Sequence, residues 1–71
     1  MEWRGMERAV RLILLMSALD SHPWTARDLA ACFGVSKRTI LRDLCTIGGA
    51  ELGYPLVFVD GLYQKWNGKE A

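Results

Sequence analysis

Three cationic side chains near the middle of the chain give it its clearest capacity to bind a charged ligand. Lys37, Arg38 and Arg42 lie in a segment that contains no acid before Asp43. A guanidinium can donate two hydrogen bonds to a phosphate or to guanine O6 and N7, whereas a lysine ammonium suits phosphate. Arg38 and Arg42 are four residues apart, so a helix would place them one turn apart on the same side. The segment therefore predicts a helical face that contacts a polyanion.

The residues around these cations predict a tight turn and the start of a helix. Gly34 permits the turn, and Ser36 is a favoured N-cap whose hydroxyl accepts from the first backbone N–H groups of the helix. Those N–H groups and the helix dipole also suit an anion. At about 100° per residue, Ile40, Leu44 and Ile47 lie on one side, which is expected to pack. The opposite, exposed side holds Arg38, Leu41, Arg42 and Cys45.

Local signals divide the rest of the N-terminal two thirds into helices. Pro23 disfavours helical backbone at the residue before it and so ends a first helix. Thr25, followed three residues later by Asp28, forms a capping-box pattern at the start of a second. Gly48 and Gly49 end the third. The expected helices span about residues 4–19, 26–33 and 37–47.

A β-hairpin is expected over about residues 55–66, which makes the fold mainly α with a small two- or three-stranded sheet. Asp60-Gly61 separates two β-rich runs, and this pair favours a type I′ turn. The resulting register pairs Val59 with Leu62 and Phe58 with Tyr63. Because an isolated hairpin is barely stable, one of its faces must pack on the helices. The two candidate faces hold Leu56, Phe58 and Tyr63, or Val57, Val59 and Leu62.

The first helix is apolar around most of its circumference, which exceeds the single stripe that a small domain needs. The excess predicts a second buried contact, with a twin chain or with a further domain. For a twin chain we expect self-association through Val10, Leu14 and Leu15. Alternatively, Trp3 or the C-terminal tail covers this surface within the chain.

The composition argues against several other functions. A chain of 71 residues forms one domain, and a domain of this size buries only about 60% of its unfolded surface, which leaves little room for a catalytic pocket. Cys32 and Cys45 lack the spacing of metal ligands, and His22 is the single histidine. The acids are scattered over caps and turns. We therefore expect no enzyme activity, no cofactor, no metal site and no assignable small-molecule ligand.

The sequence also predicts a cytoplasmic protein. The apolar run from Leu12 to Met16 is far too short to span a bilayer, and the charged start of the chain is unlike a secretory signal. Cys32 and Cys45 are expected to be reduced thiols. No membrane contact is expected.

Two segments carry a resemblance to a known family: Trp-Thr-Ala-Arg-Asp-Leu-Ala at 24–30, and Phe-Gly-Val-Ser-Lys-Arg-Thr-Ile-Leu-Arg-Asp-Leu at 33–44. They resemble the winged helix-turn-helix of deoxyribonucleoside-regulator (DeoR) type bacterial repressors, and are equally similar to the N-terminal domain of the WYL-domain regulators. The resemblance covers roughly residues 10–66. It implies that the third helix enters the DNA major groove and that the hairpin is the wing.

The resemblance also implies which residues contact DNA. The matching positions are Ser36, Lys37, Arg38, Thr39 and Arg42. The residues themselves add Leu41, which can contact thymine methyl groups or mark a protein surface, and Lys65 near the root of the wing. The wing tip carries an acid, Asp60, where a wing that grips phosphate would carry a base.

We therefore expect one domain, residues 1–71, that binds duplex DNA as a transcription regulator and forms a homodimer through its first helix. The formal charge of only +1 means that the distribution of charge, not its total, must provide the DNA-binding surface. The alternative is a winged helix used for protein–protein interaction without DNA binding. The near-neutral charge, the acidic wing tip and the apolar first helix favour that alternative.

Overall fold

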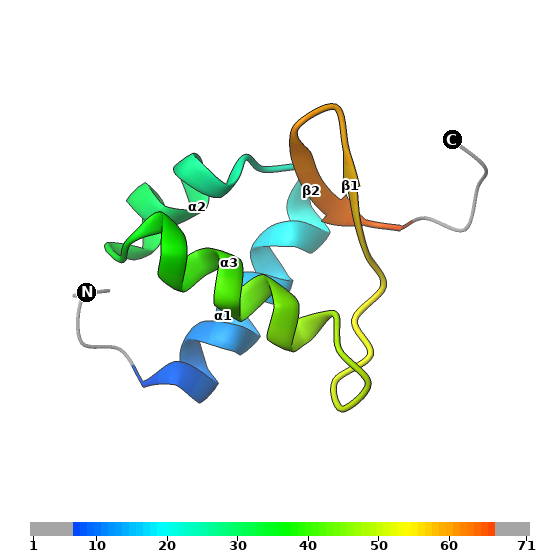
Figure 1. Cartoon of the computed structure of the whole chain (residues 1–71), viewed down its shortest axis with the longest axis horizontal. Helices are drawn as coiled ribbons and strands as arrows, with labels where there is room; N and C mark the ends of the chain where they lie inside the picture. Colours follow the sequence, from blue (N-terminus) through cyan, green and yellow to red (C-terminus); the bar gives the residue numbers. More distant parts are fainter. Residues whose placement is uncertain (1–6, 67–71) are drawn as a thin grey trace.

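The computed structural model describes residues 7–66, in which three helices precede a two-stranded antiparallel hairpin. In Figure 1, α3 crosses in front of α1, and the hairpin stands beside the C-terminal end of α1. This arrangement confirms the expected mainly helical fold with a hairpin wing. The elements are α1 (Arg8–Ser21), α2 (Ala26–Phe33), α3 (Lys37–Ile47), β1 (Leu56–Val59) and β2 (Leu62–Lys65).

The bounds of α1 differ from the expected ones. The helix begins at Arg8, after Glu7 in an extended conformation, and it continues to Ser21. Pro23 restricts only the residue directly before it, and His22 is indeed extended, with φ −170° and ψ 168°. The helix can therefore run two residues beyond its expected end at 19. The expected start at residue 4 lies outside the described residues.

The core is built from one face of each helix. Leu15 and Leu29 are completely buried, as are Ile40 and Ile47 on the side of α3 that the sequence predicted to pack. The buried apolar residues are Leu15, Leu19, Ala26, Leu29, Ala30, Phe33, Ile40, Leu44 and Ile47. Half-buried aromatic residues from the loops and the hairpin, including Trp24, Tyr54 and Tyr63, pack against this cluster.

The turn between α2 and α3 fixes the direction of α3. Gly34 is in the left-handed region at φ 67°, where a side chain would be strained, and ends α2. Ser36 then caps α3, because its hydroxyl accepts from Thr39 N–H at 3.1 Å. The equivalent cap of α2 is Thr25, whose hydroxyl accepts from Asp28 N–H at 3.0 Å.

The hairpin has the predicted register, with Val59 opposite Leu62 and Phe58 opposite Tyr63. Asp60 and Gly61 have φ of 54° and 80°, as a type I′ turn requires. Trp24 adds a single bridge of a third strand, exchanging hydrogen bonds of 2.9 and 2.6 Å with Tyr63. Leu56 and Tyr63 pack on the core, whereas Phe58, nearer the tip, is 59% exposed.

A buried ion pair joins α3 to α1. Asp43 is 1% exposed, and both of its oxygens accept from Arg11, at 2.5 and 3.2 Å. This hydrogen bonding raises the pKa of Arg11, so its guanidinium stays charged. Arg11 comes from α1, 32 residues earlier in the chain.

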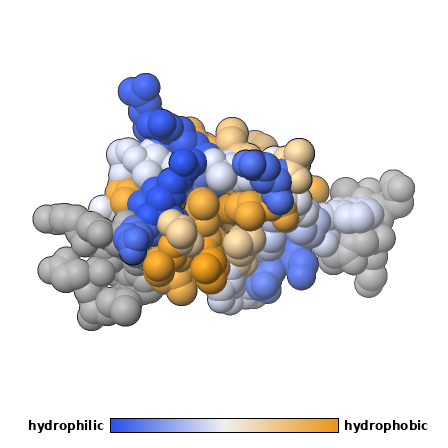
Figure 2. All heavy atoms as spheres, turned by 90° about the horizontal axis from the view of Figure 1, so that it is seen from below, coloured by the Kyte–Doolittle hydropathy of each residue, from blue (hydrophilic) through white to orange (hydrophobic). Residues whose placement is uncertain are grey.

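The apolar surface of α1 is only partly available for self-association. Val10 is 45% and Ile13 62% exposed, and Figure 2 shows apolar side chains gathered on the lower side of the molecule, where α1 lies. Leu15 is completely buried in the core, so its expected role in a dimer contact is wrong. Leu15 packs among the buried residues of the other helices, whereas Leu14 is half-buried at the edge of the core. Trp3 and the C-terminal tail lie outside the described residues.

Replacing Asp43 with Asn should lower the free energy of unfolding by about 3–5 kcal/mol, because Arg11 would keep its charge in a site where it has lost its carboxylate. Asp60→Asn removes the same charge from an exposed turn that tolerates asparagine, and should change stability by less than about 0.5 kcal/mol. Urea unfolding of the two variants measures the difference. Equal losses would contradict the assigned role of the ion pair.

Candidate nucleic-acid interface

The exposed side of α3 carries most of the candidate residues. Lys37, Arg38 and Arg42 are exposed, and within residues 7–66 none of them forms an ion pair. Leu41 is 37% exposed between them. At the start of the helix, the Ser36 hydroxyl donates to Thr39 Oγ1 at 3.0 Å, so these two side chains form one polar group. The result is a cationic helix face with an apolar side chain at its centre.

A groove borders this face on the side of the hairpin. It has a volume of about 300 Å³, and two cations, Arg27 and Lys37, line it together with two exposed apolar side chains, Leu41 and Phe58. The Phe58 ring packs beside that of Tyr63, with the ring centroids 4.5 Å apart. We call this feature the wing-side groove. Its full lining is Thr25, Ala26, Arg27, Lys37, Leu41, Phe58, Gly61 and Tyr63.

Sequence reasoning did not select Arg27 or Phe58 for this site. The alternation of the hairpin assigned Phe58 to the same face as Leu56 and Tyr63, which do pack on the core. Phe58 is nearer the tip of the hairpin than Leu56, so its ring lines the groove and does not enter the core. The proximity of both residues to α3 depends on tertiary packing and leaves no local pattern in the sequence.

A smaller hollow of about 160 Å³ borders α3 on the opposite side, against α1. Arg42 and Thr39 line it from α3, and Arg8 and Arg11 line it from α1, with Asp43 at its base. Arg8 was not among the candidate residues that the sequence selected. We call this feature the α1-side hollow. The cationic face of α3 therefore lies between two concave surfaces.

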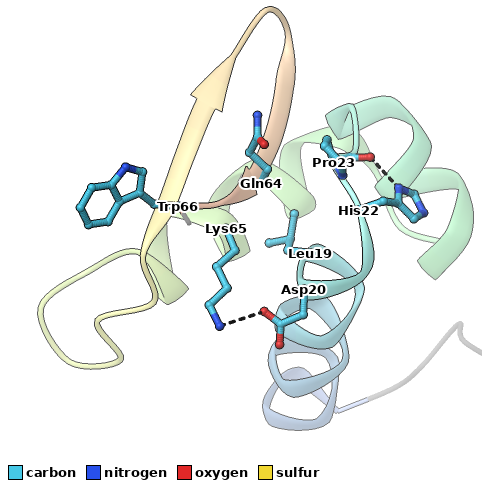
Figure 3. A pocket seen from close by; sticks show the side chains of 7 residues that line it. All are labelled: Leu19, Asp20, His22, Pro23, Gln64, Lys65 and Trp66. Atoms are coloured by element: carbon cyan, nitrogen blue, oxygen red, sulfur yellow. Dashed lines mark hydrogen bonds and ion pairs between the residues drawn. The ribbon is translucent and has the colours of Figure 1, made fainter. Parts of the chain in front are cut away.

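Lys65 lies apart from the cations of α3. Its Nζ is 3.7 Å from Asp20 Oδ1, at the C-terminal end of α1, and Figure 3 shows its side chain directed toward that carboxylate. Tyr54 donates to the same oxygen at 2.7 Å, and burial together with this bond raises the pKa of Tyr54. Lys65 thus helps to hold the root of the hairpin on α1. It is not brought together with the other candidate residues.

A further hollow, about 450 Å³, is beside this ion pair and is open to solvent. In Figure 3, Trp66 and His22 lie on opposite sides of it rather than converging on one point. The His22 ring stacks on Trp24 with centroids 4.4 Å apart, and its Nδ1 is 2.7 Å from the Pro23 carbonyl. His22 is therefore a loop residue with partners of its own.

Among residues 7–66, no three His, Cys, Asp or Glu side chains are grouped as metal ligands. Over the same residues, no helix is both long and apolar enough to cross a bilayer. Cys32 and Cys45 are exposed free thiols.

The capped α2–turn–α3 unit and the hairpin define a small domain of the winged-helix type with a cationic third helix. Comparisons with known proteins do not extend this description. No protein-family model, no curated protein and no solved structure matches the chain.

Leu41→Ala should lower the free energy of unfolding by no more than about 1 kcal/mol, because Leu41 stands at the surface between two concave features. The same deletion at the fully buried Leu29 should cost about 3 kcal/mol, since it leaves a cavity. Urea unfolding of the two alanine variants compares them directly. Similar losses would show that Leu41 belongs to the core and is not presented to a partner.

Proposed function

We propose that this domain binds duplex DNA as a transcription regulator, with α3 in the major groove. The observation that carries the proposal is the group of three cations on α3, exposed and without ion pairs among the described residues. Cations that are only part of a solvated surface are commonly interspersed with acids. Here the single acid of α3, Asp43, is buried on the other side of the helix, so the exposed side is positive.

The side chains suit different parts of the DNA. Arg38 is in the first turn of α3, and the N-terminal residues of a recognition helix are the ones that contact base edges. Lys37 suits a backbone phosphate, as do the Ser36–Thr39 pair and the free N–H groups of the first turn. Leu41 can contact a thymine methyl group. This division of roles agrees with the resemblance to DeoR-type and WYL-type regulators.

The wing has a supporting role in this proposal. Its only cation, Lys65, is held by Asp20, and its tip carries Asp60. At a separation of about 4 Å, a carboxylate and a phosphate repel by roughly 1 kcal/mol even in water. The hairpin therefore stabilises the domain and shapes the wing-side groove, while the tip stays away from the phosphates.

Protein–protein interaction without DNA is the second candidate, and one observation favours it. Phe58 and Leu41 are exposed apolar side chains that line the same groove. Exposed aromatic residues in a concave surface are typical of protein interfaces. The two functions differ in their response to salt, because only phosphate contacts release condensed counterions.

We further propose that the domain acts in the cytoplasm as a homodimer whose contact includes Val10 and Ile13 on α1. These two side chains are well exposed, and at about 100° per residue Val10 lies roughly 200° around the helix from Arg8. The apolar surface and the α1-side hollow thus use different sides of α1. A dimer would present two copies of α3 to two half-sites.

Lys37→Ala should weaken binding to all duplexes to a similar extent and flatten the slope of log K against log salt by about one, because it removes one phosphate contact. Arg38→Ala should weaken binding to a preferred duplex by about 1–3 kcal/mol and relax the sequence preference. Fluorescence titration of a labelled duplex at two salt concentrations tests both. Parental binding by both folded variants would refute the assignment of α3 to DNA.

Sedimentation at micromolar concentration should show a dimer, and Ile13→Glu should convert it to a monomer, because the contact would bury a charge. Ile13 is 62% exposed in the single chain, so this change should leave the fold intact. Leu52→Glu, at a 48% exposed position after α3, is the matched control and should remain dimeric. A parent that is monomeric at every concentration would remove the α1 contact from the proposal.

A further inference from the structure

Arg8 extends the cationic surface of α3 onto the neighbouring helix. Its Nη2 donates to Thr46 Oγ1 at 2.7 Å, and its Nε is 3.5 Å from Asp43 Oδ1, so two residues of α3 hold its guanidinium. The side chain is still 57% exposed. A guanidinium has five N–H donors. Because Thr46 and Asp43 engage no more than two of them, at least three remain for a ligand.

The α1-side hollow that contains Arg8 has a net positive charge. Three arginines, Arg8, Arg11 and Arg42, and one acid, Asp43, line it, so its formal charge is +2. The carboxylate of Asp43 is buried and accepts from Arg11, so it is compensated within the protein. Arg8 and Arg11 share this one carboxylate, and Arg42 has no ion pair among the described residues, so the hollow keeps a net positive charge. A hollow of this kind suits an anion with several oxygen acceptors.

The position of the hollow beside α3 indicates which anion it meets. An α-helix with its side chains is about 10–12 Å wide and fills a major groove about 12 Å wide, so a sugar–phosphate strand borders it on each side. Since α1 packs along one flank of α3, Arg8 lies over one of these strands when α3 occupies the groove. A backbone phosphate is then within its reach, and base edges are not.

We propose that Arg8 and Arg42 bind one backbone phosphate of the duplex between them, so that the DNA interface includes the start of α1. This inference rests on the proposed DNA binding and adds a contact outside the helix-turn-helix unit. Arg11 is a positioning residue in this scheme, because it is only 13% exposed and holds Asp43, which in turn faces Arg8.

Arg8→Ala tests the contact in the full chain, with a duplex selected by the parent protein from a random pool. The variant should bind about tenfold more weakly at low salt and reduce the salt slope by about 0.9, the value for one phosphate of B-DNA. Ser21→Glu is the charge control. It lowers the net charge by the same amount at the other end of α1, about 20 Å away, and this distance exceeds a Debye length of about 10 Å.

Single methylphosphonate substitutions in the same duplex locate the contact, since each one removes the charge of one phosphate. At one position in the duplex, the methylphosphonate should weaken binding by the parent protein. The same substitution should leave the affinity of Arg8→Ala and of Arg42→Ala unchanged. Arg8→Lys, which keeps the charge, should retain most of the salt slope. Urea unfolding of Arg8→Ala separates a lost contact from a lost fold, because the residue also bonds to Thr46.

The outcomes distinguish this inference from the function on which it rests. If the parent binds DNA and Lys37→Ala flattens the salt slope while a folded Arg8→Ala does not, the Arg8 phosphate contact is refuted and DNA binding stands. Identical methylphosphonate profiles for the parent and Arg8→Ala would refute it as well. If the parent shows no salt-dependent binding to any duplex, both proposals are refuted.

Discussion

The buried ion pair between Asp43 and Arg11 is the constraint on which the arrangement of the candidate interface depends. An aspartate that is 1% exposed in a small core is costly unless its charge is compensated, and here Arg11 donates to both of its oxygens. The pair fixes the rotation of α3 about its axis relative to α1. The exposed residues of α3 take their positions from that rotation, including Arg38 and Arg42.

The same ion pair explains how a nearly neutral chain can present a positive surface. The formal charge of the whole sequence is +1, yet the acid within α3 is buried and neutralised on the inner side of the helix. The basic residues of α3 remain outside, without acids beside them. Because fields at a surface fall off within about 10 Å at ordinary salt, this local distribution matters more for binding than the total charge does.

The hairpin shows how little secondary structure is needed to complete the domain. Two four-residue strands would not be stable alone, but Tyr63 exchanges two backbone hydrogen bonds with Trp24, and the Trp24 indole donates to the Ala18 carbonyl at 2.9 Å. These bonds attach the hairpin to the end of α1 and the start of α2. Its tip is left projecting, with Phe58 turned toward α3 and Asp60 in the turn. In the proposed function, α3 therefore contacts the DNA, and the hairpin stabilises the domain.

The sequence by itself determined the features that depend on neighbouring residues. The capped starts of α2 and α3 at Thr25 and Ser36 follow from local rules, as do the type I′ turn at Asp60-Gly61 and the inward side of α3. Such features depend on steric limits and hydrogen bonds within a few residues of chain, so a short sequence pattern is enough to predict them.

Only the tertiary structure decided which distant residues meet. Arg11 donates to Asp43, which is 32 residues later in the chain. The same packing of α1 on α3 lets Arg8 donate to Thr46. Lys65 forms an ion pair with Asp20. Leu15 is buried in the core, where a second chain cannot contact it. These outcomes depend on the angles at which the helices cross and on which apolar faces fill the core most completely. Those are properties of the whole packed chain, so no local spacing contains them.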